Sequence, residues 1–204
     1  MFKKHAVLLC LAATIILMII AASGYPGGSI LDKNSEGFHW TKNFISNLFQ
    51  EKALNGMDNP YWMWAVVGAA FHSLGSGLFF IHMSKKMPSK HAAMVLKVVG
   101  TAEILFNFLI ATSLHDIMVV ISSTLSLLGL FYITVFLLKT KLHVFKICSI
   151  ACMLTFYYTL FLYGSGDWGL LAIMQKVSFI ISMLLILGLE YFTRKEDFDP
   201  KQAT

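Results

Sequence analysis

The sequence has 204 residues, of which 57% are hydrophobic and only 13% are charged, and its mean hydropathy is +0.69. A soluble domain of this length needs a charged surface that these residues cannot supply, so the composition excludes a soluble globular protein. The net charge of +5 does not indicate nucleic-acid binding, because the basic residues gather at alternate hinges between apolar runs.

The apolar runs are each about twenty residues long, the length that a helix needs to cross a hydrocarbon core of about 30 Å. They predict an all-α, polytopic membrane protein whose residues 1–204 form a single six-transmembrane-helix bundle. The predicted spans are approximately 6–23, 61–84, 92–113, 117–138, 144–163 and 168–193.

The first run, Ala6–Ser23, has a secretory signal peptide as its alternative interpretation, because Ala21-Ala22-Ser23 resembles a cleavage site. The run is longer than a usual signal-peptide core, so we expect it to be retained as a span. The hinges and chain ends that alternation places on one side hold most of the basic residues: Lys3, Lys4, Lys85, Lys86, Lys90, Lys139, Lys141, Lys146, Arg194, Lys195 and Lys201. This asymmetry predicts a plasma (cytoplasmic) membrane protein with both termini cytoplasmic.

Residues 24–60 are predicted to form a large first extracytoplasmic loop. Its apolar residues recur at helical spacing with polar residues opposite: Trp40, Phe44, Ile45, Leu48 and Phe49. The spacing predicts an interfacial helix over Trp40–Glu51 that lies on the membrane or caps the bundle.

Polar side chains inside the spans each cost about 2.5 kcal/mol or more if ionised, so each of them needs a structural or functional reason. Counted along their helices, several reach similar depths and can face one polar cavity that opens outward. The candidate ligand-binding residues are His72, Ser76, Glu103, Asn107, Gln175 and Lys176. The candidate catalytic residues are His72, Glu103, His115 and Asp116.

Two interpretations of these groups stay open. In the first, Lys176 holds an anionic headgroup while His72 and Glu103 transfer protons. In the second, Glu103 and Lys176 form a buried ion pair that only stabilises the bundle. No HExxH, HxxxH, phosphate-binding loop, GxSxG or CxxC motif is present in the sequence, so neither a metal nor a cofactor is expected.

The stretch Asn43-Phe44-Ile45-Ser46-Asn47-Leu48, followed by Asn59-Pro60 and an aromatic-led second span, resembles a known arrangement. It is similar to six-span proteins of the FGF-receptor-activating and damage-regulated autophagy modulator type, and more closely to their bacterial relatives without assigned function. The resemblance implies a six-helix bundle tied to lipid handling or membrane homeostasis, with no agreed catalytic set.

The leading functional hypothesis is a non-enzymatic membrane protein that binds a membrane lipid or similar amphiphile in an outward-facing cavity. The alternative is an intramembrane lipid hydrolase or transferase that uses His72 and Glu103, so whether the protein is an enzyme stays open. A small transporter is a second alternative, although the sequence has no inverted repeat.

Overall fold

The structure is a computed structural model that describes residues 2–199, and within that range it contains α-helices and short 3-10 helices but no strand. The α-helices are α1 (Phe2–Ser23), α2 (Trp62–Lys86), α3 (Lys90–Leu109), α4 (His115–Leu137), α5 (His143–Ser165) and α6 (Trp168–Phe192). The 3-10 helices are η1 (Ile45–Phe49) and η2 (Lys195–Phe198). Six helices are long and apolar enough to cross a membrane, which confirms the predicted all-helical class and its six candidate spans.

The helices begin and end within a few residues of the predicted boundaries, because capping and turn-forming residues stand at those points. The Ser89 hydroxyl accepts a hydrogen bond from the N–H of Ala92 at the start of α3. Asp167 does the same for α6 by accepting from the N–H of Leu170 at 3.1 Å. Gly166 ends α5 with a φ of 76°, a left-handed conformation that glycine adopts without steric cost.

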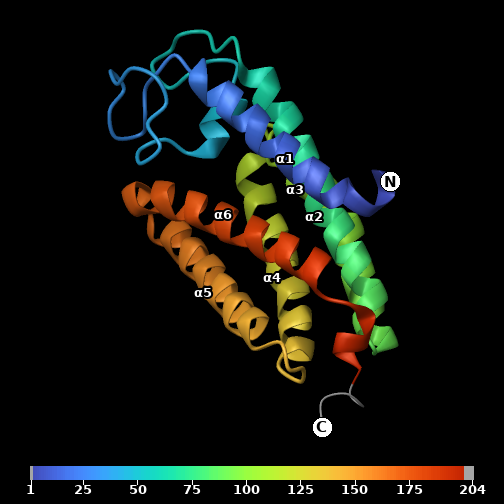
Figure 1. Ribbon diagram of the computed structural model, residues 1–204. Helices are drawn as coiled ribbons and strands as arrows, with labels where there is room; N and C mark the ends of the chain where they lie inside the picture. The colour runs from blue at the N-terminus through green and yellow to red at the C-terminus, as the bar shows by residue number, and fades with distance from the viewer. Residues whose placement is uncertain (1, 200–204) are drawn as a thin grey trace.

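Helices that follow one another in the chain pack side by side, and α6 returns to contact α1 and α2 (Figure 1). Helices α2 and α3 approach each other closely where Gly77 faces Gly100. A Cβ atom on either glycine would lie 2.5 Å from the carbonyl oxygen of the other. Small residues at this contact therefore allow the two backbones to touch, as is usual between helices in membranes.

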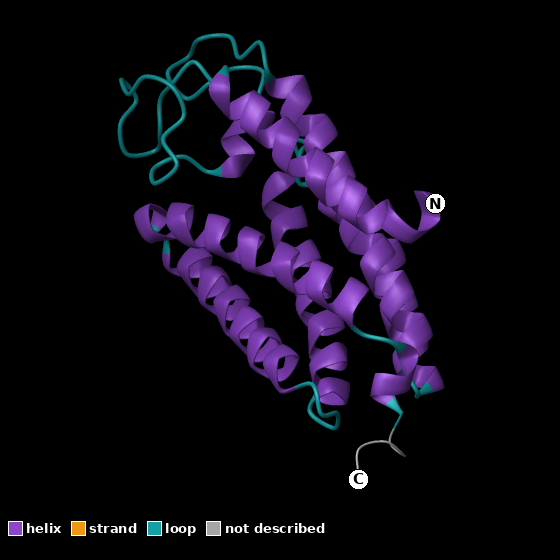
Figure 2. Cartoon of the chain, viewed as in Figure 1, coloured by secondary structure: helices purple, strands orange, loops and turns teal. Residues whose placement is uncertain are grey.

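Residues 24–61 connect α1 to α2 and lie at one end of the bundle, near the beginning of α6 (Figure 2). We call them the 24–61 segment. Tyr25 anchors the segment: its ring is only 3% exposed and its hydroxyl accepts a hydrogen bond from the N–H of Leu54 at 3.1 Å. Burial raises the pKa of the Tyr25 phenol, and the bond from Leu54 opposes that shift. The segment is therefore folded onto itself.

The predicted helix over Trp40–Glu51 is wrong, since only Ile45–Phe49 is helical and it is a 3-10 helix. Asn43 and Asn47, which the helical pattern placed on a polar outer face, are buried instead. Their side chains bond to nearby backbone groups: Asn43 to the N–H of His39 and the carbonyl of Gly28, and Asn47 to the N–H of Phe44. Such local bonds offer the backbone an alternative to helical hydrogen bonds, and here they stabilise turns.

The apolar residues of the same stretch are mostly buried, although the helix is absent. Phe44, Ile45 and Leu48 are each less than 9% exposed and pack against the bundle. Trp40, in contrast, is 52% exposed. The apolar pattern identified a packed stretch but gave the wrong backbone conformation for it.

Candidate functional site

A cavity of about 530 Å³ lies where α4, α5 and α6 meet the 24–61 segment, with one residue from each of α2 and α3 in its wall. Its apolar wall includes Ile110, Val119, Phe156, Leu160, Leu171 and Phe179. Its end next to the 24–61 segment, called the segment end below, includes Asn47, Gln50, His115, Asp116, Trp168 and Gln175. Deeper along the helices lie Ser122, Ser126, Thr159, Ser178 and Ser182, called the hydroxyl cluster below.

His72 of α2 also lines this cavity. Its Nδ1 atom is 3.2 Å from the side-chain amide nitrogen of Asn107 on α3, and its ring stacks on Phe179 of α6 with the centroids 4.8 Å apart. Its Nε2 atom is buried and has no hydrogen-bond partner among residues 2–199. The histidine is therefore held in place on one side and unsatisfied on the other, as a ligand-facing group would be.

Glu103 of α3 is fully buried directly behind the cavity wall. Its carboxylate accepts hydrogen bonds from the hydroxyls of Ser122 at 3.1 Å and Ser126 at 2.8 Å, both on α4. The ion pair between Glu103 and Lys176, one of the two interpretations left open by the sequence, is not formed, because within the described chain the partners of Glu103 are Ser122 and Ser126 of α4 and Asn107 of its own helix. The depth of a residue along its helix does not give the direction in which its side chain points, and Glu103 points at α4.

Lys176 of α6 faces the 24–61 segment. Its ammonium group donates to the carbonyl oxygens of Asn43, at 2.5 Å, and Ala172, at 2.6 Å, and lies 5.9 Å from the centroid of the Phe38 ring. The neighbouring Gln175 accepts a hydrogen bond from the N–H of Ile45 at 2.8 Å. Lys176 does not line the cavity. Its contacts instead connect α6 to the 24–61 segment.

His115 and Asp116 stand at the start of α4, at the segment end of the cavity. The His115 Nδ1 atom is 2.9 Å from the Asp116 carboxylate, which also accepts a longer bond of 3.5 Å from the Tyr163 hydroxyl. The Nε2 atom of His115 is buried and unpartnered within the described residues. Ser76, the remaining candidate, lines a smaller adjoining cavity of about 60 Å³ together with His72.

The structure thus brings His72, Asn107, His115, Asp116 and Gln175 to one cavity and places Glu103 one side chain behind it. Sequence reasoning missed the polar residues of α5 and α6 in its wall: Thr159, Ser178 and Ser182. The signal for two of them was present, because Ser178 and Ser182 are four residues apart in α6 and so share a face of the helix.

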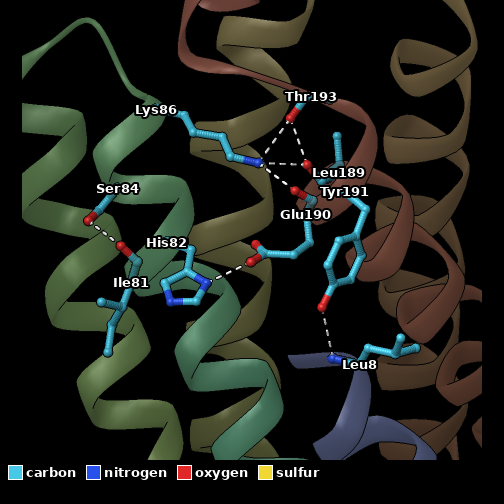
Figure 3. Close-up of polar contacts among 9 residues, drawn as sticks. All are labelled: Leu8, Ile81, His82, Ser84, Lys86, Leu189, Glu190, Tyr191 and Thr193. Atoms are coloured by element: carbon cyan, nitrogen blue, oxygen red, sulfur yellow. Dashed lines mark hydrogen bonds and ion pairs between the residues drawn. The ribbon is translucent and has the colours of Figure 1, made fainter. Parts of the chain in front are cut away.

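A second polar group, also missed, joins α2 to α6 at the other end of the bundle (Figure 3). The His82 Nδ1 atom is 2.6 Å from the Glu190 carboxylate. The Lys86 ammonium group donates to the backbone carbonyls of Leu189 and Glu190, both at 2.9 Å, and to the hydroxyl of Thr193 at 3.3 Å. A lysine at the last carbonyls of a helix satisfies acceptors that have no helical partner, so this group acts as a clamp on the end of α6.

Comparison with known protein families, characterised proteins and solved structures gives no match to this chain. The resemblance seen in the Asn43–Leu48 stretch therefore remains a prediction. Within residues 2–199, no group of three or more His, Cys, Asp or Glu side chains is placed to hold a metal ion.

Proposed function

We propose that the protein is an integral membrane protein that binds a membrane lipid or a similar amphiphile in the cavity between α4, α5, α6 and the 24–61 segment. The observation that carries the proposal is the cavity itself, whose volume of about 530 Å³ falls within the range of small-molecule sites. Its wall combines an apolar surface with convergent polar groups, which is the combination that an amphiphile requires.

Two features of the wall support an amphiphile rather than a fully apolar or fully polar ligand. Phe156, Leu160 and Phe179 offer surface to a hydrocarbon chain. The buried Nε2 atoms of His72 and His115 have no partner within the described residues, and an unsatisfied buried polar atom is costly unless a ligand or water meets it. A ligand with both kinds of surface would satisfy both requirements.

The proposal includes an orientation of the protein in the membrane. The hinge between α2 and α3, the turn between α4 and α5, and the C-terminal end of α6 carry the basic residues Lys85, Lys90, Lys139, Lys141 and Arg194. By the positive-inside rule that end faces the cytoplasm, so the 24–61 segment and the cavity beneath it face outward from the plasma membrane. The ligand would then come from the outer leaflet or from outside the cell.

A bulky substitution in the wall tests the proposal. Val119→Trp projects an indole into the cavity and should remove lipid that copurifies with the protein, as measured by mass spectrometry of the extracted lipids. Val120→Trp is the matched control, because Val120 is the next residue of α4, is 45% exposed and does not line the cavity. Equal lipid in the wild type and in both variants would contradict binding in this cavity.

The second candidate function is an intramembrane lipid hydrolase or transferase. One observation favours it: Asp116 binds Nδ1 of His115, while Nε2 has no partner within the described residues and is free to accept a proton. A carboxylate that orients a histidine in this way is typical of a general base. His115→Ala should then abolish cleavage or transfer of an ester lipid by the purified protein while lipid still copurifies. Absence of any turnover in the wild type would leave the binding function alone.

A further inference from the structure

The hydroxyl cluster lies deep in the bundle, and the direction of its hydrogen bonds limits what it can bind. Counted from the first residue of each helix at 1.5 Å per residue, Ser126 is about 16 Å into α4 and Ser178 about 15 Å into α6. A serine hydroxyl has one hydrogen to donate and two lone pairs that accept. The use already made of each hydrogen therefore decides whether a residue can still donate to a ligand.

On α4 the hydrogens of the cluster are already used. Ser122 and Ser126 both donate to the carboxylate of Glu103, at 3.1 and 2.8 Å. These serines can therefore only accept hydrogen bonds from a ligand in the cavity, through their oxygen lone pairs. Ser123, which also lines the cavity, has no side-chain hydrogen-bond partner within the described residues and keeps its hydrogen.

On α5 and α6 the same holds. Thr159 donates to the carbonyl of Thr155 at 2.8 Å, so in its contact of 2.7 Å with Ser178 the hydrogen must come from Ser178. Ser182 donates to the carbonyl of Phe179 at 2.9 Å. All five members of the cluster are therefore hydrogen-bond acceptors toward the cavity.

The histidines add one acceptor and one donor. The Asp116 carboxylate can only accept, so in the neutral His115 ring Nδ1 carries the hydrogen and Nε2 is an acceptor. The amide nitrogen of Asn107 can only donate, so Nδ1 of His72 accepts and Nε2 carries a hydrogen. The buried Nε2–H of His72 therefore needs an acceptor.

The charges around the cavity disfavour an anion. No lysine or arginine of the described residues lines it, since Lys176 is turned toward Asn43. The Asp116 carboxylate, at the segment end, would repel a phosphate or carboxylate. The start of α6, where a helix would attract an anion, already has the Asp167 carboxylate as its cap.

From this pattern we propose that the cavity selects an uncharged hydroxyl group and seats it against the hydroxyl cluster. An alcohol donates its hydrogen to the acceptor-rich wall and accepts from His72 with its oxygen. An ether cannot donate, and a protonated amine cannot accept. A carboxylate can accept from His72 but cannot donate to the hydroxyl cluster, and it brings a negative charge. This inference rests on the proposed amphiphile binding and specifies the chemical class of the bound polar group.

Four probes with the same hydrocarbon chain test the inference: dodecanol, dodecyl methyl ether, dodecylamine and laurate. Each is added at the same mole fraction to the full-length protein in phosphatidylcholine nanodiscs, and occupancy is measured by native mass spectrometry. We expect dodecanol to bind about tenfold more tightly than each of the others, since each of them leaves at least one buried polar group unpaired. Equal or tighter binding of any of the other three overturns the inference.

A pair of substitutions locates the selectivity. Ser182→Ala removes a cluster acceptor but no bond between helices, because Ser182 donates only within its own helix in the described contacts. It should lower the preference for dodecanol over the ether at least about threefold. Thr124→Ala is the control, because Thr124 also donates within its own helix, to Val120, but is exposed and does not line the cavity. An unchanged preference for dodecanol over the ether in Ser182→Ala overturns the proposed position of the hydroxyl group against the hydroxyl cluster.

The outcomes separate the inference from the function on which it rests. If no probe binds and Val119→Trp leaves the copurified lipid unchanged, the proposed function fails, and the inference fails with it. If all four probes bind alike and Val119→Trp blocks them, the protein binds amphiphiles in this cavity but does not select a hydroxyl group.

Discussion

Replacing Lys176 by methionine tests whether this lysine fastens the 24–61 segment or serves a ligand. The substitution keeps the length of the side chain and removes its charge. In the wild type the ammonium group donates to the carbonyl of Asn43, a residue with no exposed surface, and to Ala172 in the previous turn of α6. The Ala172 oxygen belongs to the helix, so the Asn43 oxygen is the group that loses its partner.

The expected cost is local. A hydrogen bond from a charged donor contributes about 1.5–3 kcal/mol, and a figure of about 2 kcal/mol is reasonable here because Lys176 is only partly buried. That cost corresponds to a roughly thirtyfold larger population of the state in which the segment is detached. Gln175 still bonds to Ile45, so the segment should loosen without leaving the bundle entirely.

Hydrogen–deuterium exchange followed by mass spectrometry measures this directly. Peptides covering residues 38–48 should exchange roughly thirtyfold faster in Lys176→Met, while peptides from α2 and α3 should not change. Lys97→Met is the matched control, because Lys97 lies in α3, is exposed and has no side-chain partner within the described residues. Unchanged exchange in the segment together with lost lipid binding would refute the reasoning and restore Lys176 as a ligand-binding residue.

Two further predictions concern packing and sidedness. Gly100→Ala should destabilise the bundle by about 3 kcal/mol in thermal unfolding, because its new Cβ would lie 2.5 Å from the Gly77 oxygen. Gly164→Ala in α5 is the control: its Cβ meets nothing within 4 Å, so this variant should be neutral or slightly stabilising. Equal unfolding temperatures would contradict the close contact of α2 and α3. A cysteine at position 35 should be labelled by a membrane-impermeant reagent from outside and one at position 89 should not, and the reverse pattern would invert the proposed orientation.

The sequence predicted the six helices well because charges and turn residues mark their ends. Ser89 and Asp167, which cap α3 and α6, lie between the predicted spans. The helix over Trp40–Glu51 failed because its apolar spacing was helical while Asn43 and Asn47 were using their side chains to bond turns. Spacing reports which residues are buried and does not report what a polar side chain is bonded to.

Three of the six predicted ligand-binding residues, His72, Asn107 and Gln175, line the cavity, and their role in binding stays a prediction. The pairing of Glu103 with Lys176, one of the two interpretations left open, is not formed because the two side chains point in different directions, the first to α4 and the second to the 24–61 segment. Depth can be counted from the sequence, but the rotation of each helix about its axis depends on packing that the sequence alone does not give.

The central claim is that an amphiphile occupies the cavity between α4, α5, α6 and the 24–61 segment. The most direct measurement is an experimental structure of the protein in lipid nanodiscs prepared without removal of native lipid. The account predicts elongated density in the cavity, with its polar end against Ser126 and Ser182 and its chain along Phe156 and Leu160. A cavity closed by its own side chains, with lipid density only on the outer faces of the helices, would contradict it.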